Sequence, residues 1–245
     1  MKTYALLSAL IASVSTAVLF TSTPGTAEAA PTKAQAAAPL IVAELFTSQS
    51  CSSCPPAEAL FSDLAERDNL LTIEWHVDYW DTLFHGGSKW KDPYSDASFT
   101  ERQRSYNQTI RGTRGVYTPQ AVVNGDLEGV GNRSAEVSSI LKEAKALPLS
   151  VQIQDDVVTI GASDAEVDVL FVRLLKQHET KVKGGENKGR QLHGKNIALD
   201  AEVLGTTKSA ETQFKIPSVG AGETCAILVQ SLSKDVGPLL GAAKC

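Results

Sequence analysis

The sequence Leu40-Ile-Val-Ala-Glu-Leu-Phe46 has the composition of a buried strand, and Cys51-Ser-Ser-Cys54 follows it after a short polar segment. A run with helical periodicity comes next, in which apolar residues recur at i, i+3, i+4 and i+7 from Ala57 to Leu64. Two cysteines three apart at a strand-to-helix junction can close a small, exchangeable disulfide. A helix N-terminus favours negative charge, which lowers the pKa of the first thiol and supplies thiolate near neutral pH. This stretch therefore predicts thiol–disulfide exchange.

The two cysteines have different expected roles. Cys51, at the helix N-terminus and toward solvent, is the predicted attacking thiolate, and Cys54 is the resolving thiol that releases a mixed disulfide. An inert structural disulfide is one alternative. A zinc site is another, and it would need two more ligands at suitable spacing. Because Cys225 and Cys245 do not form a second close pair, we predict no metal and no cofactor beyond the dithiol.

The first half of the chain alternates strands and helices. The predicted elements are a strand at 40–46, a helix at 55–66, a strand at 70–77, a helix at 96–110, strands at 119–123 and 126–130, and a helix that begins at 134. Asn124-Gly125 is a strong hairpin signal between the last two strands. The resulting order, β-α-β-α-β-β-α with the dicysteine after the first strand, is typical of the thioredoxin arrangement.

The pattern of apolar and polar residues changes after Pro148. Short alternating runs separated by turn residues predict strands at 149–154, 157–161, 167–176, 195–204, 212–216 and 224–232. We therefore expect an α/β thioredoxin-like domain at 40–147, followed by an all-β, sandwich-like C-terminal domain at 148–245.

Thr118-Pro119 lies just before the third predicted strand. In a thioredoxin arrangement this slot carries a cis-proline that faces the dicysteine, and a cis X-Pro bond is uncommon and usually deliberate. Pro119 is therefore a predicted catalytic-site residue, and Thr118 a predicted substrate-binding residue whose backbone pairs with an extended client. An ordinary strand-start proline is the alternative.

Glu44 points from the first strand toward the region behind the cysteines. A buried carboxylate there would have a raised pKa and could accept the proton of Cys54. A surface carboxylate or an ion pair is the equally weighted alternative.

His76, Asp78 and Asp81 crowd the end of the second strand. They could form a copper or zinc site with the two thiols, but we expect a hydrogen-bonded scaffold for a loop. His178 and His193 have no recognisable partner spacing.

The N-terminus has the features of a targeting segment. Residues 1–29 predict a signal peptide, with a small-x-small cleavage site at Ala27-Glu-Ala29, and residues 30–39 a flexible leader. An uncleaved anchor is the minority alternative. We expect a periplasmic or secreted protein with no membrane contact after cleavage. Its mild net charge of −5, without a basic block, argues against nucleic acid as a partner.

All four cysteines lie in the part expected to be exported, where disulfides persist. Cys225 and Cys245 are expected to pair and so tie the C-terminus to a strand, although two unpaired thiols are the alternative.

Several sequence strings resemble an exported family catalogued as domain of unknown function 1223, which is thioredoxin-like. They are Glu44-Leu-Phe-Thr-Ser48 with Cys51-Ser-Ser-Cys-Pro-Pro56, His76-Val-Asp-Tyr-Trp-Asp81, Trp90-Lys-Asp-Pro93, Phe99-Thr-Glu-Arg-Gln103, Tyr117-Thr-Pro-Gln120, Glu186-Asn187 and Cys225-Ala-Ile-Leu-Val-Gln230. One departure from the family is a longer loop at 82–89. The resemblance implies the fold and the redox chemistry, and it gives no substrate.

The sequence thus predicts a thiol–disulfide oxidoreductase that exchanges disulfides with protein thiols and with an unidentified redox partner. A non-catalytic binding protein with a structural Cys51–Cys54 disulfide is the first alternative. A metal chaperone that uses both thiols and His76 is the second.

Overall fold

The strand that precedes the dicysteine forms the centre of a sheet. In the computed structural model, which describes residues 1, 40–84, 87–231 and 236–245, β1 (Ile41–Thr47) pairs in parallel with β2 (Leu70–His76). On its other side β1 pairs antiparallel with β3 (Gln120–Val123), which forms a hairpin with β4 (Leu127–Val130). Both β1 and β2 are buried almost throughout, as expected for strands covered on both faces.

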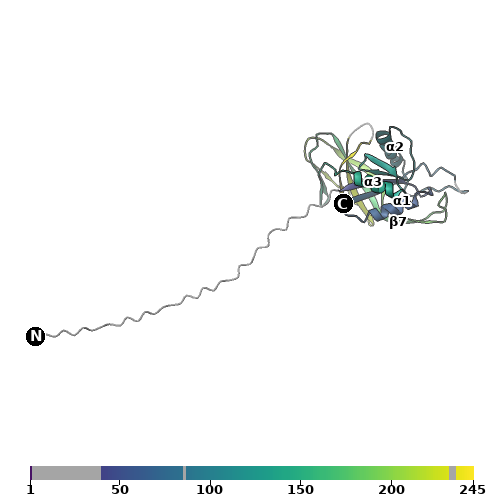
Figure 1. Ribbon diagram of the computed structural model, residues 1–245, viewed down its shortest axis with the longest axis horizontal. Helices are drawn as coiled ribbons and strands as arrows, with labels where there is room; N and C mark the ends of the chain where they lie inside the picture. Colours follow the sequence, from purple (N-terminus) through teal and green to yellow (C-terminus); the bar gives the residue numbers. More distant parts are fainter. Residues whose placement is uncertain (2–39, 85–86, 232–235) are drawn as a thin grey trace. The chain divides into compact units, whose positions relative to one another are not determined.

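Three helices cover this part of the sheet: α1 (Pro55–Leu64), α2 (Ala97–Arg111) and α3 (Ser134–Glu143). Alternate residues of β1 face opposite sides of the sheet. Val42 and Phe46 pack in the cluster that includes residues of α2, whereas Ala43 and Leu45 pack in the cluster that includes α1 and α3. Accordingly, α1 and α3 lie near each other in Figure 1, and α2 lies apart from them.

Capping residues explain where the longest helix begins and ends. The side chain of Asp96 accepts a hydrogen bond from the backbone N–H of Ser98 at 2.8 Å, which satisfies one free donor of the first turn of α2. Gly112 ends the helix in the left-handed conformation, with φ 69°, which a glycine adopts without steric cost.

The second half of the chain extends the same sheet. It contributes β7 (Val167–Lys181), β8 (Gln191–Thr207), β10 (Glu223–Ser231) and β11 (Leu239–Lys244). The strand order is β11-β10-β7-β8-β2-β1-β3-β4, so the sheet has eight strands. The junction between the halves is a parallel contact of β2 with β8, at Glu74 and Ile197.

A smaller antiparallel sheet packs on the second half. It consists of β5 (Val151–Gln154), β6 (Val157–Ile160) and β9 (Thr212–Lys215), in the order β5-β6-β9. Val158 and Ile160 of β6 share a core with Phe171, Ile227 and other residues of the large sheet.

The predicted fold class, a thioredoxin-like α/β domain followed by a separate β-sandwich, is therefore wrong. The protein is mostly β, with one mixed eight-stranded sheet, a three-stranded sheet and few helices. The order of elements in the first half agrees with the prediction, but β7 and β8 are longer than the predicted runs, and β8 joins β2. The predicted domain boundary at 147/148 falls between α3 and β5, and it stays a prediction.

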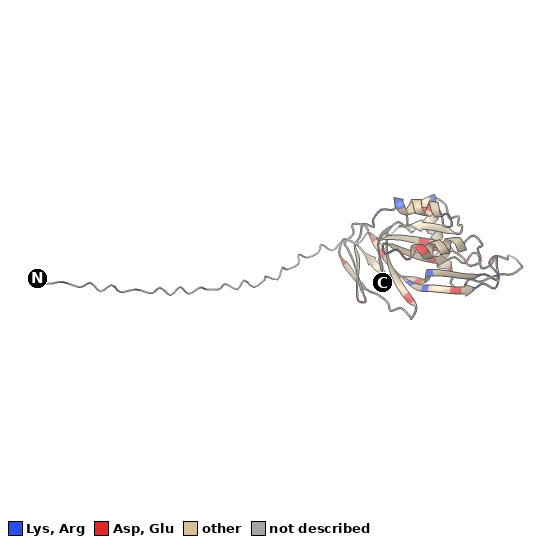
Figure 2. Cartoon of the chain, turned by 60° about the horizontal axis from the view of Figure 1, so that its bottom comes forward, with Lys and Arg blue, Asp and Glu red and all other residues tan. Residues whose placement is uncertain are grey.

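The charged residues form no single block of one sign over the described strands and helices, where red and blue positions are interspersed in Figure 2. Within the described ranges, no helix combines the length and the apolar character needed to cross a membrane. The predicted signal peptide at 1–29 and leader at 30–39 lie outside the described residues, apart from Met1.

Candidate functional site

The two cysteines of the first motif form a disulfide at the N-terminus of α1. Cys54 is the N-cap residue of the helix, and its carbonyl oxygen accepts hydrogen bonds from the backbone N–H groups of Ala57 and Glu58 at 2.8 and 3.1 Å. Pro55 follows at the first helical position, where its missing N–H is not needed. The sequence therefore places both sulfur atoms beside the positive end of the helix dipole, which favours a thiolate when the bond is reduced.

Both cysteines are fully buried, which differs from the expectation that Cys51 lies toward solvent. Each has 0% of its surface exposed, whereas the intervening Ser52 and Ser53 are exposed. The Sγ atom of Cys51 lies 3.3 Å from the Ser53 hydroxyl. A reagent that attacks the disulfide must therefore first displace whatever covers it.

The cover includes the connection between β7 and β8. We call residues 182–190 the β7–β8 loop. Asn187 of this loop is fully buried, and its side-chain amide donates to the carbonyl oxygens of Cys51 at 2.8 Å and Gln49 at 3.0 Å. The neighbouring Glu186 accepts a hydrogen bond from the backbone N–H of Ser52 at 2.8 Å. The loop is thus fastened to both sides of Cys51.

The Thr118–Pro119 peptide bond is cis, and Pro119 is buried. The loop at 131–132 joins it to the dicysteine, because Gly131 N–H donates to the carbonyl of Pro119 at 2.9 Å and the Asn132 side chain donates to the carbonyl of Ser53 at 3.1 Å. The hydroxyl of Thr118 accepts a hydrogen bond from the indole N–H of Trp80 at 2.8 Å. The structure thus brings Pro119 within one short loop of the predicted redox pair.

Glu44 forms an ion pair, which is one of the two alternatives weighed from the sequence. Its carboxylate accepts hydrogen bonds from Arg102 at 2.7 Å, Tyr106 at 2.6 Å and Trp75 at 2.8 Å, all buried on the side of the sheet that packs against α2. Among the described residues no hydrogen bond joins Glu44 to either cysteine. Glu44 therefore serves a buried ion pair, and its predicted role as proton acceptor has no geometric support.

Glu58 is the buried carboxyl group next to the dicysteine, on the first turn of α1. It accepts a hydrogen bond from the hydroxyl of Thr47 at 2.7 Å. Burial, together with the neighbouring carboxylate of Glu74, raises the pKa of Glu58 to about 8. The carboxyl group of Glu58 is therefore largely protonated at neutral pH.

His76 is held by Asp92. The Nδ1 atom of His76 lies 2.7 Å from Oδ2 of Asp92, and the same oxygen accepts the backbone N–H of Gln49 at 2.7 Å. Burial opposes the charged imidazole, but the carboxyl groups of Asp92, Glu74 and Glu58 together outweigh burial and raise the pKa of His76. The nearby Asp81 accepts hydrogen bonds from Asp92 N–H and from the Ser95 hydroxyl, which fits the expected loop scaffold.

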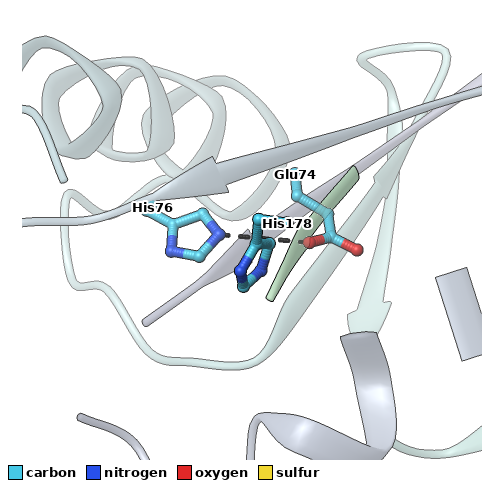
Figure 3. Close-up of side chains that lie close together, drawn as sticks. All are labelled: Glu74, His76 and His178. Carbon is cyan, nitrogen blue, oxygen red and sulfur yellow. Dashed lines mark ion pairs between the residues drawn. The ribbon is translucent and has the colours of Figure 1, made fainter. Parts of the chain in front are cut away.

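Two further buried groups face His76 (Figure 3). Oε2 of Glu74 lies 3.9 Å from Nε2 of His76, and the ring of His178 has its centroid 6.0 Å from that of His76. Burial raises the pKa of Glu74, although His76 opposes the change, and burial lowers the pKa of His178 to about 4. Nδ1 of His178 and the hydroxyl of Thr180 share a hydrogen bond, at 3.1 Å.

The last two cysteines form the second disulfide, as expected from the sequence. Cys225 lies in β10, and the backbone N–H of Cys245 donates to the carbonyl of Cys225 at 3.0 Å. This bond ties the C-terminal residue to a central part of the second half of the sheet.

Sequence reasoning missed Glu58, Glu74 and His178 as members of this region. Glu58 and Glu74 each interrupt an apolar run, which is the available signal for a buried carboxylate. His178 carries no local signal, because its proximity to His76 depends on the pairing of β7, β8 and β2.

The fold and site define a mostly β protein in which a disulfide at a helix N-terminus lies under a strand connection. Residues 42–230 match the sequence profile of the family described as protein of unknown function DUF1223, and the chain belongs to this family. A search of the curated proteins gives no match.

Two solved structures are similar. The crystal structure of protein AGR_C_4864 from Agrobacterium tumefaciens is 30% identical, with a TM-score of 0.68, over 83% of this chain and 92% of that chain. HBP35 of Porphyromonas gingivalis is 14% identical, with a TM-score of 0.51, over 84% of this chain and 74% of that chain. The second likeness concerns the fold alone.

Proposed function

We propose that this protein carries out thiol–disulfide exchange with protein cysteines through Cys51 and Cys54. The supporting observation is the disulfide at the first turn of α1, where the helix N-terminus stabilises a leaving or attacking thiolate. Ser52 and Ser53, between the cysteines, are exposed, so a client can approach this segment.

The exchange needs two steps and no cofactor. A client thiolate attacks Sγ of Cys51, so that a client–Cys51 bond forms, the Cys51–Cys54 bond breaks and Cys54 leaves as the thiolate. A second client thiolate then attacks the client sulfur of this mixed disulfide. Cys51 leaves as a thiolate, and the client is released with its own disulfide. The reverse sequence reduces a client disulfide.

The β7–β8 loop controls this chemistry in our proposal. Because both sulfurs are fully buried, exchange requires that Asn187 and Glu186 release the backbone around Cys51. Pro119 borders the same region through the loop at 131–132, where an extended client segment would lie. The clients and the redox partner are proteins of an oxidising compartment, which agrees with the predicted export.

A static role for the same disulfide is the second candidate, favoured by the complete burial of both sulfurs. The protein would then be a non-catalytic binding protein. The reduction potential separates the two candidates. We expect a Cys51–Cys54 potential in the range of oxidoreductases, whereas a value below about −300 mV would indicate a structural bond.

The measurement uses the Cys225→Ala/Cys245→Ala variant, equilibrated in glutathione buffers and quenched with a mass-tagging alkylator, so that only one disulfide is scored. Client capture in the native compartment with Cys54→Ser, compared with Cys51→Ser, supplies the second test. Fractionation of cells that express the full chain tests the proposed export.

A further inference from the structure

From the geometry we infer that Glu74, His76 and His178 form a binding site for a divalent transition-metal ion, with zinc as the best match. The ligand atoms of these three side chains lie within 4.8 Å of one another, and all three residues are buried. Figure 3 shows the two imidazole rings and the carboxylate gathered in one place.

The polar atoms that face one another have no hydrogen-bond partner among the described residues. They are both carboxylate oxygens of Glu74, Nε2 of His76 and Nε2 of His178. The ion pair of Glu74 Oε2 with Nε2 of His76 is too long, at 3.9 Å, for a hydrogen bond, so all four buried atoms are left without one, which is unfavourable. A bound cation would satisfy them together.

Both imidazoles are oriented for metal binding by their other nitrogen. Nδ1 of His76 is held by Asp92 at 2.7 Å, and Nδ1 of His178 by Thr180 at 3.1 Å. Metal-bound histidines usually have such a partner, which fixes the ring and directs the free nitrogen to the metal. In each ring it is Nε2 that remains for the ion.

A glycine in the strand between β2 and β7, which carry the three ligand residues, leaves space for the ion. β8 lies between β2 and β7 in the sheet, and Gly194 of β8 pairs with His178. A Cβ atom at position 194 would lie 2.4 Å from Oε2 of Glu74 and 2.8 Å from Nε2 of His178. Any side chain at this position would therefore occupy the space where the carboxylate and the imidazole meet.

The donor set identifies the class of metal. Two imidazoles and one carboxylate suit Zn²⁺, with bonds of about 2.0–2.2 Å, and three protein ligands leave a position for water or another ligand. Such bonds at tetrahedral angles place ligand atoms roughly 3.4 Å apart, so small side-chain rotations bring the 3.9 Å separation of Glu74 and His76 into range. The disulfide-bonded cysteines are not part of this set.

A surface cavity borders the site at His178. The cavity has a volume of about 430 Å³ and is lined by His178 and Gly194, together with Ser62, Gln177, His193 and Lys195. An ion can therefore arrive beside His178 without unfolding of the sheet.

The test is a titration of the full, oxidised protein with Zn²⁺ after removal of metal by EDTA and dialysis. We expect one Zn²⁺ per chain by calorimetry, and an absorption spectrum of four- or five-coordinate Co²⁺ when Co²⁺ is used instead. His178→Gln should lower the zinc affinity by more than the roughly 10–100-fold that loss of an orienting partner costs. Gly194→Ala should have a similar effect.

His193→Gln is the matched control, because His193 is exposed and lines the same cavity without belonging to the ligand set. It should bind zinc as the wild type does. Cys51→Ser/Cys54→Ser should also retain the zinc stoichiometry. Circular dichroism checks that each variant is folded. If Gly194→Ala does not fold, the test rests on His178→Gln alone. Absence of zinc binding by the wild type, equal losses in His178→Gln and His193→Gln, or loss in the double cysteine variant would overturn the inference.

Discussion

The side-chain amide of Asn187 donates a 2.8 Å hydrogen bond to the carbonyl oxygen of Cys51, and this contact fastens the β7–β8 loop over the disulfide. A second hydrogen bond from the same amide reaches Gln49 at 3.0 Å. Asn187 is fully buried, and the carbonyl oxygen of Cys51 also accepts a hydrogen bond from the backbone N–H of Cys54 at 3.2 Å. Asn187 thus fastens the loop together with Glu186, which accepts the backbone N–H of Ser52.

Asn187→Ala should make the Cys51–Cys54 bond easier to reduce. Unpaired buried acceptors cost about 1–3 kcal/mol, and about 1.4 kcal/mol is tenfold in an opening equilibrium. We expect dithiothreitol to reduce this disulfide roughly tenfold faster, as followed by mass tagging of the released thiols. Lys188→Ala, at the exposed neighbouring position, is the control. Equal rates in both variants would show that the loop does not limit access.

Reduced protein should show unequal thiols. The N-terminus of α1 favours a thiolate at either sulfur, but the hydroxyl of Ser53, 3.3 Å from Sγ of Cys51, can donate a hydrogen bond to a Cys51 thiolate, so alkylation at mildly acidic pH should label Cys51 before Cys54. The experiment uses the Cys225→Ala/Cys245→Ala background and peptide mass spectrometry. Cys54→Ser should accumulate mixed disulfides through Cys51, since no resolving thiol remains. Equal labelling of the two thiols would contradict the assignment of a nucleophile.

Glu58 should make the protein less stable as the pH rises. Its pKa is about 8 in the folded protein and 4.5 ordinarily, so between these values the folded state keeps a proton that the unfolded state has released. Stability from this group is therefore lost between roughly pH 4.5 and 8. The free energy of unfolding of Glu58→Gln should change less with pH than that of the wild type. Urea unfolding at pH 5 and pH 8, in the presence of EDTA, measures how the free energy of unfolding of each protein depends on pH.

The comparison reports on Glu58 together with its electrostatic interaction with Glu74 and His76, which are present in both proteins. A difference between wild type and Glu58→Gln that does not change with pH would show that Glu58 titrates normally.

The ion pair of Glu44 with Arg102 should be costly to break. Both side chains are buried, and Arg102→Met leaves the Glu44 carboxylate without its positive partner. Such a loss costs about 3–5 kcal/mol, whereas an exposed pair contributes about 0–1 kcal/mol. Arg104→Met, which removes the exposed pair with Glu101 on the same helix, is the control. Similar urea midpoints for the two variants would contradict the buried role of Arg102.

The Cys225–Cys245 bond should stabilise the fold without affecting exchange. Its cysteines are 20 residues apart, and a loop of that size corresponds to roughly 3 kcal/mol in the chain-entropy view. We expect Cys225→Ala/Cys245→Ala to unfold at lower urea and to keep the wild-type rate of Cys51–Cys54 reduction. A changed rate would indicate that the two disulfides are coupled.

Local periodicity predicted most elements of the first half, because each strand or helix there carries its own pattern. The helix expected at 55–66, for example, is α1 at Pro55–Leu64. The fold class was wrong because strand pairing is not local. The residues of β8 do not indicate that Ile197 lies beside Glu74, yet this pairing joins strands from both halves of the chain in one sheet.

The same distinction between local and non-local information applies to the candidate sites. The disulfide at Cys51 and Cys54 was visible, since both residues lie in one short motif. Burial of the pair was not, because Asn187 reaches it from a distant part of the chain. The cluster of Glu74, His76 and His178 needs three strands in register, and spacing along the chain does not reveal it.

The pairing of β2 with β8 also has a consequence for biosynthesis. During translation β2 emerges long before β8, so its edge has no partner until residue 197 has left the ribosome. An unpaired, largely apolar edge is a template for association with other chains. A nascent or truncated chain that stops before β8 therefore exposes the edge of β2, and the eight-stranded sheet is complete only once β10 and β11 have also been made.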